Sequence, residues 1–424
     1  MFSSEKIFLK DVYLQSLNAV RPSVLFEKHL HSSGNTLYFQ NTPLPVFPPG
    51  RILLAGSGKA SVQMAKALLP RLPVTPERTL LVSPRPDAAE GLQVFPGEHP
   101  LPGKKSLNAG KAMTELLRDT APGDTVFYML SGGSSSLLEY PLEGISMEDI
   151  RNAGAAFLER GMSIHEINAL RSRLSRVKGG RLAELCRANT HVFVLSDVMG
   201  NALSVIGSGP FYPPPAGSFD PDLLIETYRL GECLPEHILG KLRENAPPAA
   251  GIPATHHLLG TNTDLLGTAA GLLEKAGMRV ICFPDSLYGE AREAGEMIAQ
   301  MILQYRGERP ACILFGGETT VTLSGKSGKG GRSQETALSA LRELGGREDY
   351  ALLCAGSDGI DGNSDAAGAL VDHRTRAKAK DSGLSLTAFL RRHDSGTFHE
   401  RCESQIRTGY TGTNVNDIAM ALIR

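Results

Sequence analysis

Short apolar runs that end in glycine- or serine-rich turns, each followed by a helical pattern, recur along the chain. The clearest are 51–55 before G-S-G-K-A-S, 124–130 before S-G-G-S-S-S, 191–195 before Ser196-Asp197, 311–315 before G-G-E-T-T and 350–355 before G-S-D-G. Alternating strands and helices favour a largely parallel sheet covered by helices, and the ligands of such sheets gather at the carboxyl ends of the strands. The pattern therefore predicts an α/β protein with its ligand-binding residues in these turns.

The length of 424 residues is enough for two or three domains. Two Pro-rich passages, at 209–222 and 246–253, give the strongest linker signals, and we expect a boundary near residue 250. The predicted domains are therefore 1–250 and 251–424, each with a largely parallel sheet. The N-terminal segment 1–45 is a candidate to pack on the second domain, which would then be discontinuous.

The charge of the chain is nearly balanced, with 44 Lys and Arg against 45 Asp and Glu. No long run of one sign occurs, which argues against a nucleic-acid or membrane-surface protein. The N-terminus is too polar for a signal peptide, and no apolar run approaches the ~18 residues of a membrane span. The six cysteines are scattered without metal-binding spacing, so we expect reduced thiols in a cytoplasmic protein.

One stretch, 315–335, combines two glycine-rich turns with three cations. It runs from G-G-E-T-T to G-G-R-S and contains Lys326, Lys329 and Arg332. Glycines let backbone N–H groups approach an anion, and a helix start adds a partial positive charge. The stretch suits a phosphate or a carboxylate; the alternative is a flexible hairpin with a solvated basic tip.

The turn G-S-G-K-A-S at 56–61 joins a strand to a helix but matches neither of the phosphate-binding patterns. A P-loop would need glycine at Leu53 and Ser or Thr at Ala60, and the dinucleotide pattern would need glycine at Ser61. The turn should still expose N–H groups. Because a cation at a helix start is electrostatically unfavourable, a ligand role for Lys59 is favoured over a plain surface lysine.

The turn S-G-G-S-S-S at 131–136 offers hydroxyl and N–H groups to a phosphate or carboxylate, and it lacks the G-x-S-x-G pattern of a serine nucleophile. Asp197 and Asp358 follow strands, where a carboxylate can hold Mg²⁺ or accept a proton from a substrate hydroxyl, although Asp beside Gly also forms turns. Polar residues at 411–417 are expected to cap a final helix. Together these features suit an ATP-dependent kinase.

An ordered series of motifs extends over nearly the whole chain. It comprises A-G-S-G-K-A at 55–60, H-P-L-P at 99–102, L-S-G-G-S-S-S-L-L at 130–138, I-H-E-I-N-A-L-R-S-R-L-S-R-V-K-G-G-R-L-A at 164–183, L-S-D-V at 195–198, S-G-P at 208–210, G-G-E-T-T-V at 316–321, G-G-R-S-Q-E at 330–335, S-D-G-I-D-G at 357–362, A-A-G-A at 366–369 and T-G-T-N-V-N-D at 411–417. With these motifs the chain resembles the glycerate 2-kinase family, whose C-terminal module is called the MOFRL domain.

The resemblance implies a Rossmann-like N-terminal domain and a MOFRL-type C-terminal domain, with the active site in the cleft between them. It also implies transfer of the γ-phosphate of ATP to the 2-hydroxyl of D-glycerate, with ATP and Mg²⁺ as cofactors. By position in the family motifs, the catalytic residues would be Lys59, Arg332 and Asp197, and the metal ligands Asp197 and Asp358. The cofactor-binding residues would be Gly56, Ser57, Gly58, Ser131, Gly132, Gly133, Ser134, Gly317, Glu318, Thr319 and Asn414.

The carboxylate of a triose acid would also need a cation or a nest of N–H groups, and the candidates are Ser131 to Ser135 or Arg171. The expected partners are D-glycerate and ATP, with neither nucleic acid nor a membrane. A homodimer is compatible with the sequence.

Two positions depart from the family pattern. Gly200-Asn201-Ala202 replaces the usual G-D-[DE], so an acidic pair is missing near Asp197, and Ser333 replaces Asn. The departures bear on metal affinity or substrate scope, not on the fold. The alternatives are an NAD(P)-dependent hydroxypyruvate reductase, which family members have also been named, a kinase for another small hydroxy acid, or a non-catalytic sensor. Ser61 argues against the reductase, and a sensor would not need Lys59.

Overall fold

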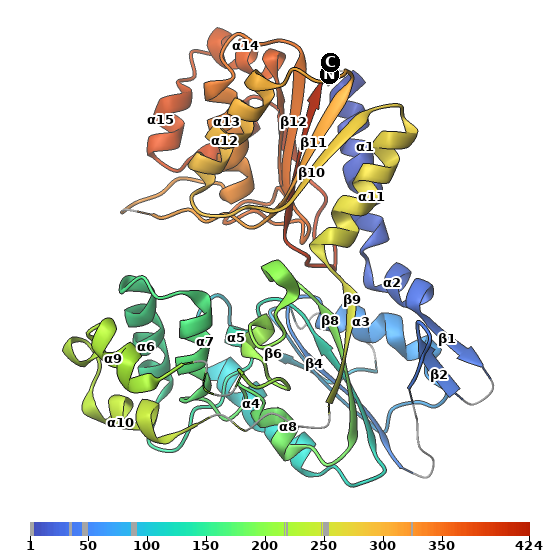
Figure 1. The fold of residues 1–424 in the computed structure, drawn as a ribbon, viewed down its shortest axis with the longest axis vertical. Helices are drawn as coiled ribbons and strands as arrows, with labels where there is room; N and C mark the ends of the chain where they lie inside the picture. Colours follow the sequence, from blue (N-terminus) through green and yellow to red (C-terminus); the bar gives the residue numbers. More distant parts are fainter. Residues whose placement is uncertain are drawn as a thin grey trace. The chain divides into compact units, whose positions relative to one another are not determined.

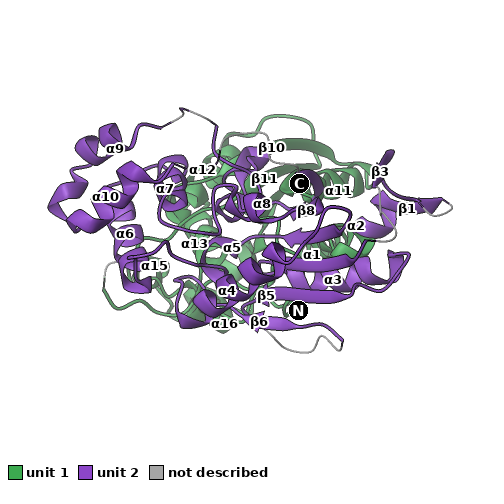
Figure 2. Cartoon of the chain, turned by 90° about the horizontal axis from the view of Figure 1, so that it is seen from below, with its two compact units in different colours: residues 1–24, 260–424 green, residues 25–259 purple. Residues whose placement is uncertain are grey.

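A computed structural model of the protein describes residues 4–33, 36–44, 50–85, 91–215, 217, 219–246, 248, 254–323 and 325–424. The chain forms two compact units, coloured separately in Figure 2: unit 1 is Met1–Val24 with Gly260–Arg424, and unit 2 is Leu25–Leu259. The boundary expected near residue 250 stays a prediction, because most of the passage 246–253 lies outside the described residues. None of the described helices is long and apolar enough to cross a membrane.

Unit 2 is built on a six-stranded sheet in the order β6-β5-β4-β7-β8-β9. Its strands are β4 (Ile52–Ser57), β5 (Arg78–Ser83), β6 (Val94–Pro96), β7 (Thr125–Leu130), β8 (Asn189–Leu195) and β9 (Ala254–Gly260). The pairs β4–β5, β4–β7, β5–β6 and β7–β8 are parallel. In chain order this is 3-2-1-4-5-6, the order of Rossmann sheets, which bind ligands where the strand order reverses. Here that switch point lies between the carboxyl ends of β4 and β7, and the Rossmann-like prediction is confirmed.

Layers on both faces cover this sheet, and every residue of its central strands β4 and β7 is buried. On one face, α4 (Lys104–Arg118) and α8 (Arg181–Leu185) share a core with the strands. On the other face, Phe193 of β8 contacts Phe26 and Phe39, with ring centroids 5.1 and 5.5 Å apart. The remaining elements near the start of this unit are α2 (Pro22–His29), β1 (Leu30–Ser33), β2 (Thr36–Phe39), β3 (Thr42–Leu44) and α3 (Ser61–Leu68).

A helical layer of unit 2 has a core of its own, around Phe157 and Ile238. It consists of α6 (Met147–Glu159), α7 (Ile164–Ser172), α9 (Pro221–Thr227) and α10 (Glu236–Glu244), which lie together beside the sheet in Figure 1. α7 begins in a capping box, in which Ser163 and Glu166 satisfy each other's backbone N–H groups. This cap fixes where the helix starts, and therefore where Arg171 stands in its last turn.

Unit 1 contains a second six-stranded sheet, in the order β10-β11-β15-β12-β13-β14. Its strands are β10 (Arg279–Leu287), β11 (Ala311–Gly317), β12 (Tyr350–Gly356), β13 (Gly368–Asp372), β14 (Gln405–Ile406) and β15 (Asp417–Ile423). α1 (Ser4–Ala19) and α11 (Asn262–Lys275) cover one face, and α12 (Ala291–Gln304) and α13 (Arg332–Glu343) cover the other (Figure 1). Three further helices, α14 (His373–Asp381), α15 (Leu386–Arg391) and α16 (Ser395–Arg401), complete the unit. The α/β class expected for both halves is confirmed, but the largely parallel sheet expected for this half is wrong. Among the described strands of this sheet only the pair β10–β11 is parallel, and the other pairs are antiparallel.

The prediction of a final helix after residue 417 is wrong, because Asp417–Ile423 is strand β15. It lies between β11 and β12 and is antiparallel to both, so β10, β11 and β12 point the same way around it. The sequence D-I-A-M-A-L-I is apolar on both faces of a strand and shows no alternation. Its Ala, Met and Leu favour a helix by propensity, but burial between two strands overrides that weak preference.

Candidate active site

The turns after β4 and β7 are joined by hydrogen bonds at the switch point of unit 2. The backbone N–H of Lys59 donates to Gly132 O at 2.9 Å, and that of Ala60 donates to Ser131 Oγ at 3.0 Å. In the other direction, Ser131 N donates to Ser57 O at 3.2 Å. The two predicted turns therefore form one structure, as expected for parallel strands whose carboxyl ends meet at one edge.

Gly58 makes this close approach possible. Its φ is +131°, and a Cβ at this position would lie 2.2 Å from Ser131 Oγ and 2.4 Å from Ser131 O. A side chain at Gly58 would push the two turns apart, so glycine is required here by space as well as by conformation.

The backbone N–H groups of the turn after β4 all donate hydrogen bonds to other atoms of the protein. Gly58 N donates to Val82 O at 3.1 Å, and Ser61 N donates to Gly58 O at 3.3 Å, so with the bonds of Lys59 and Ala60 all four N–H groups are occupied. The expectation that this turn exposes N–H groups to a ligand is wrong, because the neighbouring turn and β5 take them up. What the turn presents is the half-buried side chain of Lys59, whose Cγ lies 3.4 Å from where a Cβ on Gly133 would stand.

The serine-rich turn after β7 divides its polar groups between structure and solvent. Ser57 Oγ lies 2.5 Å from Ser134 Oγ and 2.6 Å from the Tyr128 hydroxyl, and Ser136 Oγ donates to Gly133 O at 3.2 Å. Gly133 adopts a left-handed conformation, with φ +80°, before the short helix α5 (Ser134–Leu137). Within the described residues, the N–H groups of 132–135 make no hydrogen bond. The backbone of this turn, not its buried hydroxyls, is therefore the part available to an anion.

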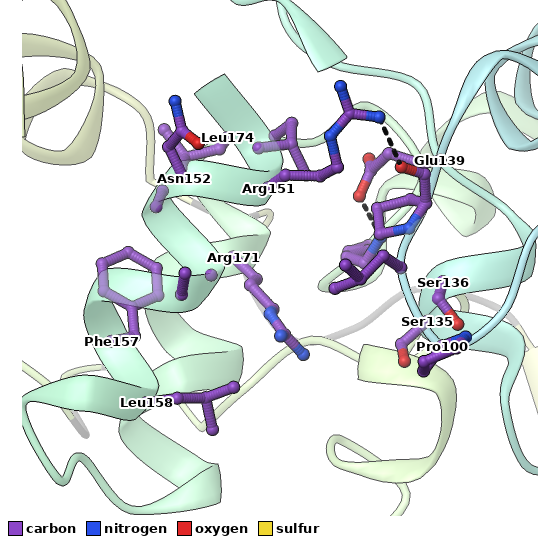
Figure 3. Close-up of a pocket in the computed structure, with 17 residues that line it drawn as sticks. Pro100, Ser135, Ser136, Glu139, Arg151, Asn152, Phe157, Leu158, Arg171 and Leu174 are labelled. Carbon is purple, nitrogen blue, oxygen red and sulfur yellow. Dashed lines mark hydrogen bonds and ion pairs between the residues drawn. The ribbon is translucent and has the colours of Figure 1, made fainter. Parts of the chain in front are cut away.

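A cavity of about 410 Å³ opens beside this turn within unit 2 (Figure 3). Ser135 and Ser136 line it together with Pro100, and Phe157 and Leu158 of α6 form an apolar wall. Its size lies within the range of roughly 300–1,000 Å³ that is usual for small-molecule sites.

Three basic side chains, those of Arg151, Arg171 and Lys178, line this cavity together with the acidic side chain of Glu139. Lys178 and Glu139 are both buried and form a very short ion pair, and Ser175 Oγ donates to the Glu139 carboxylate at 2.5 Å. Arg171 points from α7 toward the side on which Ser135 lies (Figure 3). Burial lowers the pKa of Arg171, and the negative charge of Glu139 partly opposes this effect. The sequence reasoning included Arg171 but missed the buried pair beside it.

Asp197 lies just beyond β8 and is half-buried. The segment that follows is tightly turned: Gly200 and Asn201 both have positive φ, 69° and 53°. Asp197, Lys59 and the serine-rich turn thus belong to one unit and to one end of the same parallel sheet, since each follows the carboxyl end of its strand.

In unit 1, Arg332 stands at the first position of α13 and is held by two carboxylates. It donates to Asp417 through Nε at 2.6 Å and Nη2 at 2.9 Å, and its Nη1 lies 3.0 Å from Glu318 Oε1. Burial disfavours the charged guanidinium, but the charges of Asp417 and Glu318 outweigh burial and raise the pKa of Arg332. The arginine is therefore a fixed cation at the sheet edge.

Asp361 closes the N-terminus of α13. Its carboxylate accepts from Ser333 N at 3.0 Å and from Gln334 N at 2.8 Å. Burial raises the pKa of Asp361 to about 6, although the Gln334 N–H and the charge of Arg332 oppose the shift. The helix start that was predicted as an anion site is thus occupied by an anion from the protein itself.

Asp358 and Asp417 flank Gly356 at the same edge. A Cβ on Gly356 would lie 3.1 Å from Asp417 Oδ1 and 3.4 Å from Asp358 Oδ1. The Asp358 carboxylate accepts from Ile360 N at 3.1 Å, and the buried Tyr13 of α1 donates to Gly356 O at 2.7 Å. Burial and the nearby carboxylates raise the pKa of Tyr13. The N-terminal helix therefore supports this edge directly.

The other residues predicted for unit 1 lie at this edge as well. Gly317 ends β11 with φ +129°, followed by the exposed Glu318 and the buried Thr319, and the buried Asn414 precedes β15. Sequence reasoning missed Asp417, because it was assigned to a helix cap, and it did not select Asp361 as a site residue. Among the described residues, no group of three or more His, Cys, Asp or Glu side chains is arranged to hold a metal ion.

Unit 2 defines an α/β protein of the Rossmann-like class, with a lysine and an open glycine-serine turn at the switch point of its sheet. The comparison with known families is specific. Residues 8–243 match the family described as "Domain of unknown function (DUF4147)", and residues 311–417 match the MOFRL family. The chain belongs to this DUF4147–MOFRL family, in which glycerate 2-kinases are found.

Individual relatives agree over most of the chain. A D-glycerate 2-kinase of Thermotoga maritima is 37% identical over 90% of this chain and 92% of its own length. A protein of Agrobacterium vitis that bears the name hydroxypyruvate reductase is 36% identical over 90% of this chain and 89% of its own length. A crystal structure of glycerate kinase from Thermotoga maritima has a TM-score of 0.84 at 34% identity and covers 99% of this chain and 100% of that one.

Proposed function

We propose that this protein is a glycerate 2-kinase, which transfers the γ-phosphoryl group of ATP to the 2-hydroxyl of D-glycerate and releases 2-phosphoglycerate. Glycerate phosphorylation is the activity named for its relatives and for the similar crystal structure. The structural observation that carries the proposal is the state of the turn after β4. Its backbone N–H groups donate to oxygens of the protein, so the group that the turn offers to a ligand at the switch point is the side chain of Lys59.

The same observation speaks against a dinucleotide-dependent reductase, the function that one relative's name suggests. A dinucleotide's pyrophosphate binds to free N–H groups at the start of the helix after the first strand. Here those groups, from Gly58 to Ser61, donate to oxygens of the protein. The side chain of Ser61 fills the turn further, because its hydroxyl donates to Gly58 O and Val82 O at 3.0 and 2.9 Å.

Phosphoryl transfer needs cations on the moving group and a carboxylate for the acceptor hydroxyl, with little covalent chemistry. We assign the cations to Lys59 and Arg332, and the acceptance of the 2-hydroxyl proton to Asp197. The nucleotide would be contacted by the free N–H groups of the turn at 132–135 and by Gly317, Glu318, Thr319 and Asn414. Gly56, Ser57, Gly58, Ser131 and the Ser134 hydroxyl then act by shaping the turns.

Mg²⁺ would be held by Asp197 or Asp358 together with phosphate oxygens, and it would neutralise charge on the β- and γ-phosphates. This fits the donor set, since Mg²⁺ commonly binds one or two carboxylates, substrate phosphates and waters instead of an all-protein cage. The absence of a three-ligand cluster among the described side chains is compatible with that mode of binding. Location in the cytoplasm remains a prediction from the sequence.

The test is a coupled ADP-release assay with purified full-length protein, Mg-ATP and D-glycerate, with the phosphate position read by ³¹P NMR. We expect 2-phosphoglycerate, and we expect Lys59→Ala to lower kcat by about 10²–10³-fold, the effect of removing one electrostatic donor. Lys66→Ala, at an exposed position of α3, the helix that follows this turn, is the matched control and should retain kcat. NADH oxidation with hydroxypyruvate, without glycerate-dependent ADP release, would overturn the proposal.

A further inference from the structure

We infer that the cavity lined by Arg171 is the subsite for the acceptor's carboxylate, and that Arg171 is the residue that makes the enzyme prefer hydroxy acids over neutral alcohols. The inference rests on the proposed kinase function for its catalytic readout. Its binding readout is independent of that function.

The side chain of Arg171 is a cation that no described residue pairs directly. Among the described residues, no hydrogen bond or ion pair to its side chain is found, although the side chain is largely enclosed. A guanidinium has five N–H donors and does not give up its proton in proteins. A partly desolvated cation without an acceptor is costly, so the position is explained by an anion that arrives with a ligand.

The protein's own anion in this cavity is already paired with another cation. Glu139 is the one acidic residue among the described residues that line it. Its carboxylate accepts from Lys178 Nζ, from Ser175 Oγ at 2.5 Å and from Tyr140 N at 3.0 Å. Lys178 neutralises Glu139, and Arg171 together with the exposed Arg151 leaves the lining with a net positive charge.

The cavity lies beside the turns that position Lys59. Ser135 lines the cavity and follows directly on the turn that binds the backbone of Lys59. Pro100 also lines the cavity, and His99 is its neighbour in the chain. A Cβ placed on Gly133 would lie 3.1 Å from His99 Cδ2 and 3.4 Å from Lys59 Cγ, so both side chains lie against this glycine. The same short segments therefore border both the cavity and Lys59, so a three-carbon acid held at Arg171 would have its hydroxyl on the lysine side.

The apolar part of the lining bears on the selectivity for the acceptor. Ile150, Phe157, Leu158 and Leu174 give the cavity an apolar wall that cannot replace a carboxylate as a partner for the guanidinium. A neutral analogue would leave Arg171 buried and unpaired, and sites built to pair a polar group reject analogues that lack it by large factors. The subsite therefore selects acceptors by their negative charge and not by their length.

An anion at Arg171 could also come from a phosphate of the nucleotide, and the experiment separates the two sources. Arg171→Met and Arg171→Lys are compared with wild type for kcat/KM on D-glycerate and on glycerol, the neutral analogue, and for the KM of ATP. Titration calorimetry then measures binding of D-glycerate alone and of ADP alone. Arg173→Met is the matched control, since that guanidinium lies at the same helix end but donates to Leu242 O at 2.9 Å.

For Arg171→Met we expect kcat/KM for D-glycerate to fall by about 10²–10³-fold and that for glycerol to change by less than about threefold, so that the preference for the acid collapses. D-glycerate binding should be lost while ADP binding stays, and the Lys variant should recover part of the selectivity. Arg173→Met should keep the wild-type preference. Loss of ADP binding with retained D-glycerate binding would overturn the inference, as would unchanged selectivity in Arg171→Met. Binding of D-glycerate that depends on Arg171 but is not followed by turnover would overturn the proposed function and would still support the subsite.

Discussion

Replacing Arg332 by alanine should destabilise unit 1 as well as abolish activity, because it leaves a buried carboxylate without its ion-pair partner. Asp417 is 4% exposed and is paired with Arg332 through two hydrogen bonds. Removing one partner of a buried ion pair costs about 3–5 kcal/mol. Because the Arg332 side chain is still 23% exposed, we take the lower end, about 3 kcal/mol. For a domain of roughly 150–250 residues, this corresponds to about 6–12 °C in Tm.

The double variant Arg332→Ala/Asp417→Asn isolates the cause of this loss. The asparagine removes the stranded charge and leaves a neutral polar group, whose burial costs about 1–3 kcal/mol at most. Differential scanning calorimetry, which can resolve separate transitions of the two units, should show the double variant recovering part of the lost Tm. Both variants should lose kcat by about 10³-fold or more, as expected for an arginine on the transferred group.

Two results would refute this reasoning. One is an Arg332→Ala protein as stable as wild type, which would mean that the Asp417 carboxylate finds water or another donor. The other is a double variant no more stable than the single variant, which would place the cost in packing instead of charge. If only the single variant were inactive, its loss of kcat would reflect damage to the fold and not a missing catalytic cation.

Two further predictions concern unit 2. Burial lowers the pKa of His191 and His257 to about 4, from about 6.5 in the unfolded chain, so the unfolded chain binds more protons between these values. Stability present above pH 6.5 is therefore lost as the pH falls toward 4, by about 1.4 kcal/mol per histidine at pH 5.5. The midpoint of urea unfolding, compared at pH 7.5 and 5.5, measures this loss. His191→Gln should reduce the difference between the two midpoints, and His165→Gln, at an exposed site, should leave it unchanged. Any other outcome for either variant would contradict the prediction. Gly58→Ala should lower the Tm by several degrees, because its Cβ would meet Ser131 Oγ at 2.2 Å, and it should lower activity with it. Gly144→Ala, also at positive φ but with nothing within 4 Å, should cost only about 1 kcal/mol, and equal losses in the two variants would count against the turn.

The sequence predicted the elements that local pattern determines. The strand–turn–helix units at 52–68 and 125–137 follow from apolar runs that stop at glycine and serine, and the residues that border the switch point were found for that reason. Arg171 was also among the candidates. The residues of these turns and Arg171 could be found because each belongs to a motif that lies next to its strand or helix in the sequence.

The errors have a common physical origin in contacts between distant segments. Whether the N–H groups after β4 are free depends on β5 and on the turn after β7, neither of which is local. The pairing of Arg332 with Asp417 spans 85 positions, and the role of β15 as a central strand depends on β11 and β12. The buried Glu139–Lys178 pair gave no signal, since each residue alone reads as a surface charge.

The place of β15 in unit 1 bears on how the chain can fold while it is being synthesised. All of unit 2 emerges from the ribosome before the strand that divides the sheet of unit 1 exists, so residues 25–259 can fold first. Helix α1, with its apolar Leu9, Val12 and Leu17, has no completed sheet to cover until residue 423 has been made. At about 5–20 residues per second this takes roughly 20–80 s. During that interval the apolar face of α1 is open to chaperones, and unit 1 can be completed only after residues 25–259 have been synthesised.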